Sequence, residues 1–233
     1  MNRLLRRCTS WKQISRLSVV MKSKAPDRAP SSGHCMQQPS PLYQDQYRSL
    51  LRLLATVAPP LFVMGGFAED ALLVHRFTRQ HADLDVLVLR SQLSRQLQQL
   101  KSLGLARFEV APEETPGRPL VLGTHVDHLH IEIWVSAQEP RGGYSFEVEG
   151  QPPPSRFRVF LPEDTFQYPA TTVEGVALHT ISPLALYQLR AISAMTRSVG
   201  EKRSHDLAMQ ERLRQAFLAG QDEQQLRPRL APL

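Results

Sequence analysis

The chain has 233 residues, of which 42% are hydrophobic and 21% charged, which is typical of one globular domain with an appendage. The net charge of +6 and the pI of about 9.7 would favour a polyanionic partner. However, residues 1–40 hold eight of the 28 basic and one of the 22 acidic residues, which leaves 20 and 21 for residues 41–233. The charge of the body therefore argues against an extended nucleic-acid track, and no apolar run approaches the roughly 20 residues that cross a membrane.

The leading segment, 1–40, is rich in Arg, Lys, Ser and Pro. Three interpretations compete: a disordered basic extension, an organelle transit peptide, and a start assigned upstream of the true one at Met21 or Met36. Both cysteines, Cys8 and Cys35, lie here, so the body has no thiol for a disulfide, a zinc site or a nucleophile. We expect a disordered extension on a cytoplasmic protein without a membrane anchor, which agrees with a reducing compartment.

The body opens with a helix and a short strand. Residues 42–57 carry apolar side chains at three- and four-residue spacing, which predicts an amphipathic helix that a Pro pair ends. The apolar run 61–64 predicts a buried strand. Gly65 and Gly66 then predict a tight turn whose backbone can approach a ligand closely. A helix is expected over 67–75, and its free N–H groups can hold phosphate.

Two aspartates begin the next apolar run, 83–89. Because strand side chains alternate, Asp83 and Asp85 should project on the same side. Adjacent carboxylates repel each other, which raises the pKa of one of them unless a positive charge neutralises it, and a divalent metal is the commonest neutraliser at such a strand start. The pair therefore predicts a metal site, with a turn bearing solvated carboxylates as the alternative.

A helix is predicted next, over 92–103, with Ser91 as its N-cap and Gly104 as its end. A strand at 107–111 follows, and a Pro- and Gly-rich loop leads to a short strand at 120–122.

The segment 125–135, HVDHLHIEIWV, predicts another strand. Its alternation places Leu129, Ile131, Ile133 and Val135 on one face and His128, His130, Glu132 and Trp134 on the other. An ionised Glu132 between two isoleucines is costly unless it is paired, and the expected partner is the same metal. Asp127 is the alternative carboxylate, and a zinc set of His128, His130 and Glu132 is the alternative site.

The rest of the chain predicts short strands at 144–148, 157–161 and 173–179, a helix from 183 to about 196, and a last helix at 201–219. Ser182 is the expected cap of the first of these helices, with Pro183 at its first position. Lys202, Arg203 and His205 form a basic cluster at the start of the last helix.

These residues resemble the DNA polymerase beta-like nucleotidyltransferase superfamily, and more narrowly its aminoglycoside and lincosamide nucleotidyltransferase branch. The resemblance spans residues 42–217. It rests on Gly65-Gly66-Phe67-Ala68 with Asp70, on the run TRQHADLD that ends at Asp85, on the helix that begins with Ser182-Pro183, and on Lys202-Arg203-Ser204-His205-Asp206.

The resemblance implies an α/β (α+β) fold class with a mixed β-sheet flanked by helices, a catalytic core at 41–180 and a C-terminal helical part at 181–233. It also implies Mg²⁺-dependent transfer of a nucleoside monophosphate from a nucleoside triphosphate, with ATP expected, to a hydroxyl of a small acceptor such as an aminoglycoside or lincosamide antibiotic. The alternatives are a toxin-like enzyme acting on tRNA or protein and a non-catalytic nucleotide-binding relative. The oligomeric state is left open.

For the site, the resemblance implies that Asp83, Asp85 and Glu132 bind one or two Mg²⁺ ions. Glu132 is also a candidate general base on the acceptor hydroxyl. Gly65 and Gly66 would hold the triphosphate through backbone N–H groups. This assignment agrees with in-line transfer, in which metals neutralise the attacking and leaving oxygens and side chains mainly position the reactants.

Five further residues keep two interpretations each. Arg79 and His81 either contact the substrate or fix their loop through bonds to the aspartates. Lys202 and Arg203 either stabilise departing pyrophosphate or form a solvated helix start. Asp70 either complements the N-terminal dipole of its helix or takes part in catalysis.

Overall fold

The computed structural model describes residues 41–105, 121–126, 129–149, 156–196 and 201–233, all of which belong to one unit, Met36–Leu233. The predicted extension at 1–40, the predicted strand at 107–111, and Asp127 and His128 lie outside the described residues. For 41–42, 121–126, 149, 196 and 201–203, only the backbone is described.

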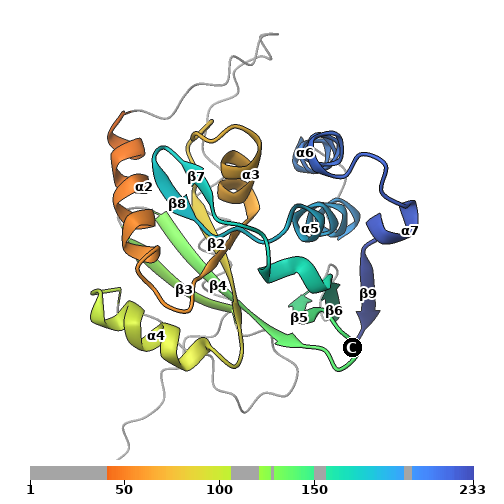
Figure 1. Cartoon of the computed structure of the whole chain (residues 1–233), viewed down its shortest axis with the longest axis horizontal. Helices are drawn as coiled ribbons and strands as arrows, with labels where there is room; N and C mark the ends of the chain where they lie inside the picture. Colours follow the sequence, from red (N-terminus) through yellow and green to blue (C-terminus); the bar gives the residue numbers. More distant parts are fainter. Residues whose placement is uncertain (1–40, 106–120, 127–128, 150–155, 197–200) are drawn as a thin grey trace, which may run out of the picture. The chain divides into compact units, whose positions relative to one another are not determined.

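A mixed sheet of seven strands forms the centre of the described part (Figure 1). The strands lie in the order β1 (Phe62–Met64), β2 (Asp83–Leu89), β4 (Leu129–Gln138), β5 (Tyr144–Glu149), β6 (Arg156–Leu161) and β9 (Arg229–Pro232), and β3 (Val121–Val126) also pairs with β4. Strands β2 and β4 are parallel, and the other neighbours are antiparallel. The predicted mixed sheet is confirmed.

Helices surround this sheet: α2 (Pro41–Leu54), α3 (Gly65–Leu73), α4 (Leu93–Ser102), α5 (Pro183–Thr196), α6 (Glu201–Phe217) and the short α7 (Glu223–Leu226). Helix α2 packs beside a hairpin of β7 (Thr171–Val173) and β8 (Val176–Leu178), and α3 packs on β1 and β2. Helices α5 and α6 pack on each other and on α3 (Figure 1). None of the described helices is long and apolar enough to cross a membrane.

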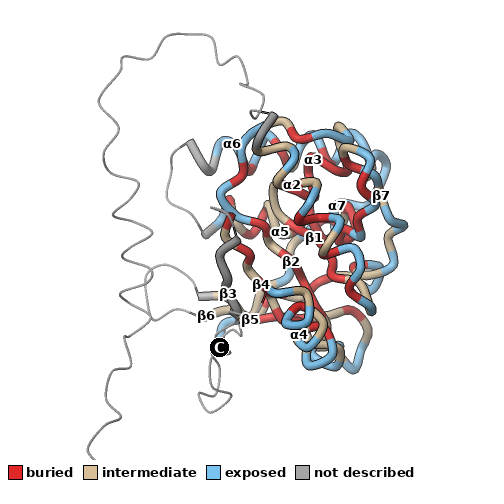
Figure 2. Tube along the Cα trace, turned by 90° about the vertical axis from the view of Figure 1, so that its left-hand side faces the viewer, coloured by how far each residue is buried: buried red, intermediate tan, exposed pale blue. Residues whose placement is uncertain are grey.

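The core forms around β2, which lies between β1 and β4. Leu84, Val86 and Leu87 are fully buried, so both faces of this strand are covered. Figure 2 shows the buried residues running along the central strands, with exposed residues on the outer sides of the helices. The first residue of β2, Asp83, is exposed, so the strand is fixed by its apolar residues while its polar end is accessible.

The predictions around α3 and α4 need correction. Helix α3 begins at Gly65 itself and ends at Leu73, so the separate glycine turn and the helix limits of 67–75 are wrong. The N-cap of α4 is Gln92 without a side-chain bond, so Ser91 is not the cap. The Gln92 N–H donates to the Leu89 carbonyl, and this turn at the end of β2 delays the helix start to Leu93.

Two predicted strands are each divided between two strands in the structure. The segment 125–135 divides between β3 and β4, which pair antiparallel with His125 opposite His130. The segment 173–179 contains a turn at Glu174 and Gly175, whose φ angles are 47° and 77°. Two successive positive φ angles suit a tight hairpin turn, and an ion pair of Glu174 with Arg48 at 3.0 Å holds this one against α2.

At the C-terminus, the predicted cap is confirmed, because the Ala185 N–H donates to Ser182 Oγ at 3.1 Å. The last long helix ends at Phe217 rather than 219. Strand β9 was not predicted, because its four residues include a proline and carry no alternating pattern. This strand pairs with β6, so the segment 181–233 is not helical throughout.

Candidate functional site

Three carboxylates lie where β2 and β4 run side by side. The register pairs Asp83 with His130 and Asp85 with Glu132, so the backbones of Asp85 and Glu132 are about 4.8 Å apart. Paired residues project on the same face of a sheet, and the intervening Ile131 faces the core. The structure therefore brings Asp83, Asp85 and Glu132 to one surface, which we call the carboxylate platform.

Asp85 is the inner member of the carboxylate platform. Its Oδ1 accepts a hydrogen bond from Trp134 Nε1 at 3.4 Å. Burial, and then the negative charges of Glu132 and Asp83, raise the pKa of Asp85 to about 7, although the Trp134 bond and the charge of Arg190 act in the opposite direction. A bound cation would favour the ionised form of this group.

Glu132 has a protein partner at this surface. Its Oε1 lies 3.2 Å from His130 Nδ1, and this hydrogen bond raises the pKa of His130. Across the part of the chain that the structure describes, no group of three or more His, Cys, Asp or Glu side chains is already arranged to hold a metal. The hard oxygen donors and their mutual repulsion fit a divalent cation, and the bond to His130 engages one of the two oxygens of Glu132.

Helix α3 begins directly against the carboxylate platform. Met64 is opposite Asp85 in the β1–β2 ladder, and Gly65 follows with a φ of 65°. A Cβ on Gly65 would lie 2.5 Å from Asp85 Oδ2, so only glycine fits. The N-terminus of α3 has no side-chain cap, which leaves its first N–H groups available beside the carboxylates.

Gly65→Ala is expected to destabilise the protein by more than the 1–2 kcal/mol or so of a left-handed alanine, because the methyl group also displaces the Asp85 carboxylate. Urea unfolding measures the loss. Gly104→Ala is the matched control, because Gly104 has a φ of 82° and no atom lies within 4 Å of the place that its methyl group would take. Equal losses in the two variants would contradict the contact with Asp85.

A buried network fixes the loop between α3 and β2. His81 Nε2 lies 2.8 Å from Asp70 Oδ2, and Asp70 also accepts bonds from the Thr78 N–H at 2.9 Å and the Thr78 hydroxyl at 2.6 Å. The Tyr47 hydroxyl accepts from the His81 N–H and donates to the His81 carbonyl. His81 thus anchors the loop through Asp70 rather than through the aspartates of β2. Asp70 lies beyond the first turn of α3, so its predicted dipole role is wrong.

The remaining predicted residues lie near helix starts. A Cβ on Gly66 would lie 2.6 Å from Arg79 Nη2, so the exposed Arg79 places a positive charge over the start of α3. Lys202 and Arg203 are in the first turn of α6, but their side chains are outside the described part. Their proposed contact with pyrophosphate stays a prediction.

Sequence reasoning assigned no role to a buried ion-pair network between α3, α5 and α6. Arg190 Nη1 lies 2.9 Å from Asp206 Oδ1, and Arg190 Nε contacts Glu69 Oε1. Glu69 and Asp206 are 2% and 0% exposed. Burial lowers the pKa of Arg190, but the charges of Glu69 and Asp206 raise it further, above its usual value. A lone Arg in the apolar segment LALYQLRAI was the available signal.

The stability of the metal-free protein should fall as the pH rises from about 4 to 7. The unfolded chain releases the Asp85 proton near its ordinary pKa of 3.8, whereas the folded protein keeps it up to about pH 7. Folding therefore takes up a proton in this window, and that contribution to stability is lost as the proton leaves. Urea unfolding in chelator across this range tests the trend, and Asp85→Asn should flatten it. A slope that Asp85→Asn leaves unchanged would contradict this origin.

Comparison with known proteins supports the fold. No family model matches the sequence, and no curated protein matches it. The crystal structure of ANT(2'')-Ia in complex with adenylyl-2''-tobramycin aligns at 18% identity and a TM-score of 0.50, over 75% of this chain and 98% of that one.

Two other solved structures align less closely. The solution structure of the antibiotic-resistance factor ANT(2'')-Ia aligns at 17% identity and a TM-score of 0.49, over 76% and 91% of the two chains. The CD-NTase CdnG of Bradyrhizobium diazoefficiens in complex with GTP gives 12% identity and a TM-score of 0.27, over 72% and 68%. The crystal structure carries the conclusion: this chain shares the fold of ANT(2'')-Ia, which agrees with the α/β fold that the motifs predicted.

Proposed function

We propose that this protein transfers a nucleoside monophosphate from a nucleoside triphosphate to a hydroxyl group of a small molecule. One observation carries the proposal: Asp85 is beside two further carboxylates, Asp83 and Glu132, and its burial, followed by their negative charges, raises its pKa to about 7. The ionised form of such a group is unfavourable by itself, and a bound cation stabilises it. The nucleotidyltransferase fold supports the same conclusion.

Asp83, Asp85 and Glu132 are the residues that would hold Mg²⁺, which when bound supplies charge neutralisation at the reacting phosphate. The uncapped start of α3 would bind the triphosphate through the N–H groups that follow Gly65, with Arg79 adding a positive charge above Gly66. The network of His81 with Asp70 positions the loop that leads into Asp83.

In the transfer, the acceptor oxygen forms a bond to the α-phosphorus while the bond from that phosphorus to the bridging oxygen breaks, and pyrophosphate leaves with the electron pair. The hydroxyl proton passes to a carboxylate. We assign this role to Glu132, because it is half-exposed on the carboxylate platform and its bond to His130 orients one of its oxygens.

Aminoglycosides are the first acceptors to test, because the aligned crystal structure contains adenylyl-2''-tobramycin. Lincosamides follow from the motifs, and ATP is the first nucleotide. A near-neutral body, with 20 basic and 21 acidic residues in 41–233, suits a small acceptor better than a long nucleic acid. A cytoplasmic location stays a prediction.

The test is a transfer assay with α-labelled nucleoside triphosphates, Mg²⁺, and separate pools of aminoglycosides, lincosamides and tRNA. Label should move to an antibiotic pool and should not move when EDTA replaces Mg²⁺. Labelled tRNA would instead favour the toxin-like alternative. The bond between Glu132 and His130 favours one more alternative, a non-catalytic relative, which would bind nucleotide in calorimetry and transfer nothing to any pool.

A further inference from the structure

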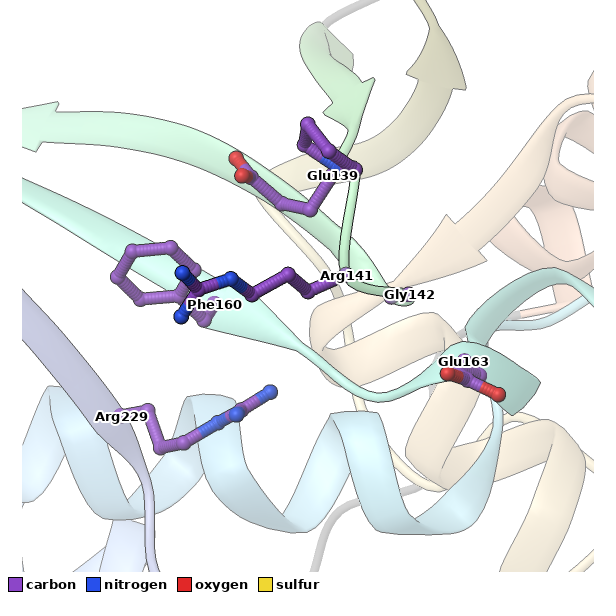
Figure 3. A pocket seen from close by; sticks show the side chains of 8 residues that line it. Glu139, Arg141, Gly142, Phe160, Glu163 and Arg229 are labelled. Atoms are coloured by element: carbon purple, nitrogen blue, oxygen red, sulfur yellow. The ribbon is translucent and has the colours of Figure 1, made fainter.

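A hollow lies at the other end of β4 from the carboxylate platform. Its volume is about 550 Å³, and its lining includes Glu139, Arg141, Gly142, Phe160, Glu163 and Arg229 (Figure 3). The side chains come from the β4–β5 turn, the end of β6, a 3-10 turn at Glu163–Phe166 and β9. Since Glu139 follows Glu132 by seven positions, about 23 Å of extended chain separates them. The hollow is therefore distinct from the proposed transfer site.

Strand pairing places the floor of this hollow on one face of the sheet. Phe160 is directly opposite Ser145 of β5 and directly opposite Arg229 of β9. Side chains of residues that face each other across a ladder emerge on the same side. The guanidinium carbon of Arg229 lies 6.0 Å from the centroid of the Phe160 ring, and Arg141 reaches from the turn toward the same open space (Figure 3).

The arginines on this face fall into two groups. Arg156 and Arg158 both form ion pairs with Glu147. Arg141 and Arg229 are exposed, and neither forms an ion pair with another residue in the described ranges. A guanidinium carries five N–H donors in a planar fork that matches a carboxylate or phosphate. Arg141 and Arg229 are therefore available to bind an anion, whereas Arg156 and Arg158 already pair with Glu147.

Two acidic side chains line the same hollow in defined positions. Glu139 Oε1 accepts a hydrogen bond from the Ser145 hydroxyl. Glu163 lies directly over Gly142, where a Cβ would overlap Glu163 Oε1, and the φ of Gly142 is 91°. Glycine at 142 thus allows Glu163 to occupy this place. Two cationic and two anionic side chains share the hollow, so its lining is balanced in charge.

We propose that this hollow binds a small soluble zwitterion. The anionic group of the ligand, a phosphate or carboxylate, contacts Arg141 and Arg229, and its ammonium group contacts Glu163. Paired charges on the ligand match the balanced lining, whereas a polyanion would meet repulsion from both carboxylates. The inference does not depend on the proposed transfer reaction, because it uses none of the residues of the carboxylate platform.

Calorimetry on the full chain with phosphoethanolamine as the probe tests this proposal. We expect it to bind at least about tenfold more tightly than inorganic phosphate or ethanolamine, because each of these carries only one of the two charges. The double substitution Arg141→Ala with Arg229→Ala should weaken binding at least about tenfold. Arg158→Ala is the matched control, since Arg158 lies on the same face but already pairs with Glu147.

A second variant tests the ammonium contact. Glu163→Gln should weaken phosphoethanolamine binding and leave the weak binding of inorganic phosphate unchanged or stronger. Three results would overturn the proposal: phosphate binding as tightly as phosphoethanolamine, affinity unchanged in the double arginine variant, or binding to phosphatidylethanolamine vesicles without binding to free phosphoethanolamine. The last result would assign the hollow to a lipid surface.

Discussion

Asp85→Asn is expected to reduce nucleotidyl transfer by about 10³-fold or more and, at the same time, to raise the stability of the metal-free protein. A metal held by carboxylates contributes several kcal/mol of charge stabilisation in the transition state, and about 4 kcal/mol corresponds to a factor of 10³. The gain in stability has a separate cause: asparagine has nearly the same shape and no charge, so it removes the cost of burying a charge and the repulsion from Glu132 and Asp83.

The two effects are measured separately. Single-turnover transfer gives the loss in rate, and thermal unfolding in EDTA gives the gain, at about 2–4 °C for each kcal/mol in a chain of this size. The gain should be present at pH 8 and nearly absent at pH 5, where Asp85 in the wild type is already protonated. Asp45→Asn is the control, because Asp45 is exposed and forms only a surface ion pair with Arg48.

A loss of transfer activity together with a gain in stability distinguishes a functional carboxylate from a structural one. If Asp85 served only to hold Trp134 or the start of α3, its replacement would lower stability together with activity. Retained transfer in Asp85→Asn would contradict the proposed function outright. Higher stability with lost transfer would show that the native sequence keeps an unfavourable charge for the sake of the reaction.

The residues of the carboxylate platform could be predicted from the sequence, because the alternation of side chains between the two faces of a strand is a local property. Spacing alone places Asp83 and Asp85 on the same side of one strand. It also places Glu132 on the opposite face of its strand from Ile131 and Ile133. The neighbours of each carboxylate depend on register, which a single sequence does not contain. Sequence analysis therefore missed that Asp85 lies beside Trp134 and that Glu132 pairs with His130.

The predicted glycine turn was wrong, and strand β9 was not predicted, for related reasons. A Gly pair predicts positive φ, but only Gly65 has it here, and the helix begins at this residue, against which Asp85 packs. Strand β9 exists only because β6 presents an open edge to it, and four residues with a proline carry no such signal of their own. Local chemistry is visible in the sequence, and long-range pairing is not.

Arg190→Met is expected to lower the free energy of unfolding by about 3–5 kcal/mol, which corresponds to a fall in Tm of about 10 °C. The guanidinium neutralises Glu69 and Asp206, which are almost fully buried, and methionine would leave both without this partner. Glu69 lies on the helix that begins at Gly65, so the loss should also reach the carboxylate platform. Urea unfolding measures the change, and Arg214→Ala is the control, because its pair with Glu223 is exposed and should contribute less than about 1 kcal/mol.

A second substitution separates charge from packing. In the Arg190→Met background, Glu69→Gln should recover part of the lost stability, because it removes a buried carboxylate that no longer has its partner. Burial already raises the pKa of Glu69, and without Arg190 an ionised Glu69 is still less favourable. Arg190→Met alone should therefore become less stable, relative to wild type, as the pH rises above the ordinary Glu pKa of 4.5. A deficit that is the same at every pH, and that Glu69→Gln does not reduce, would mean that Arg190 acts by filling space between α3, α5 and α6. A deficit that grows with pH would identify its charge as the link between the C-terminal helices and the helix beside Asp85.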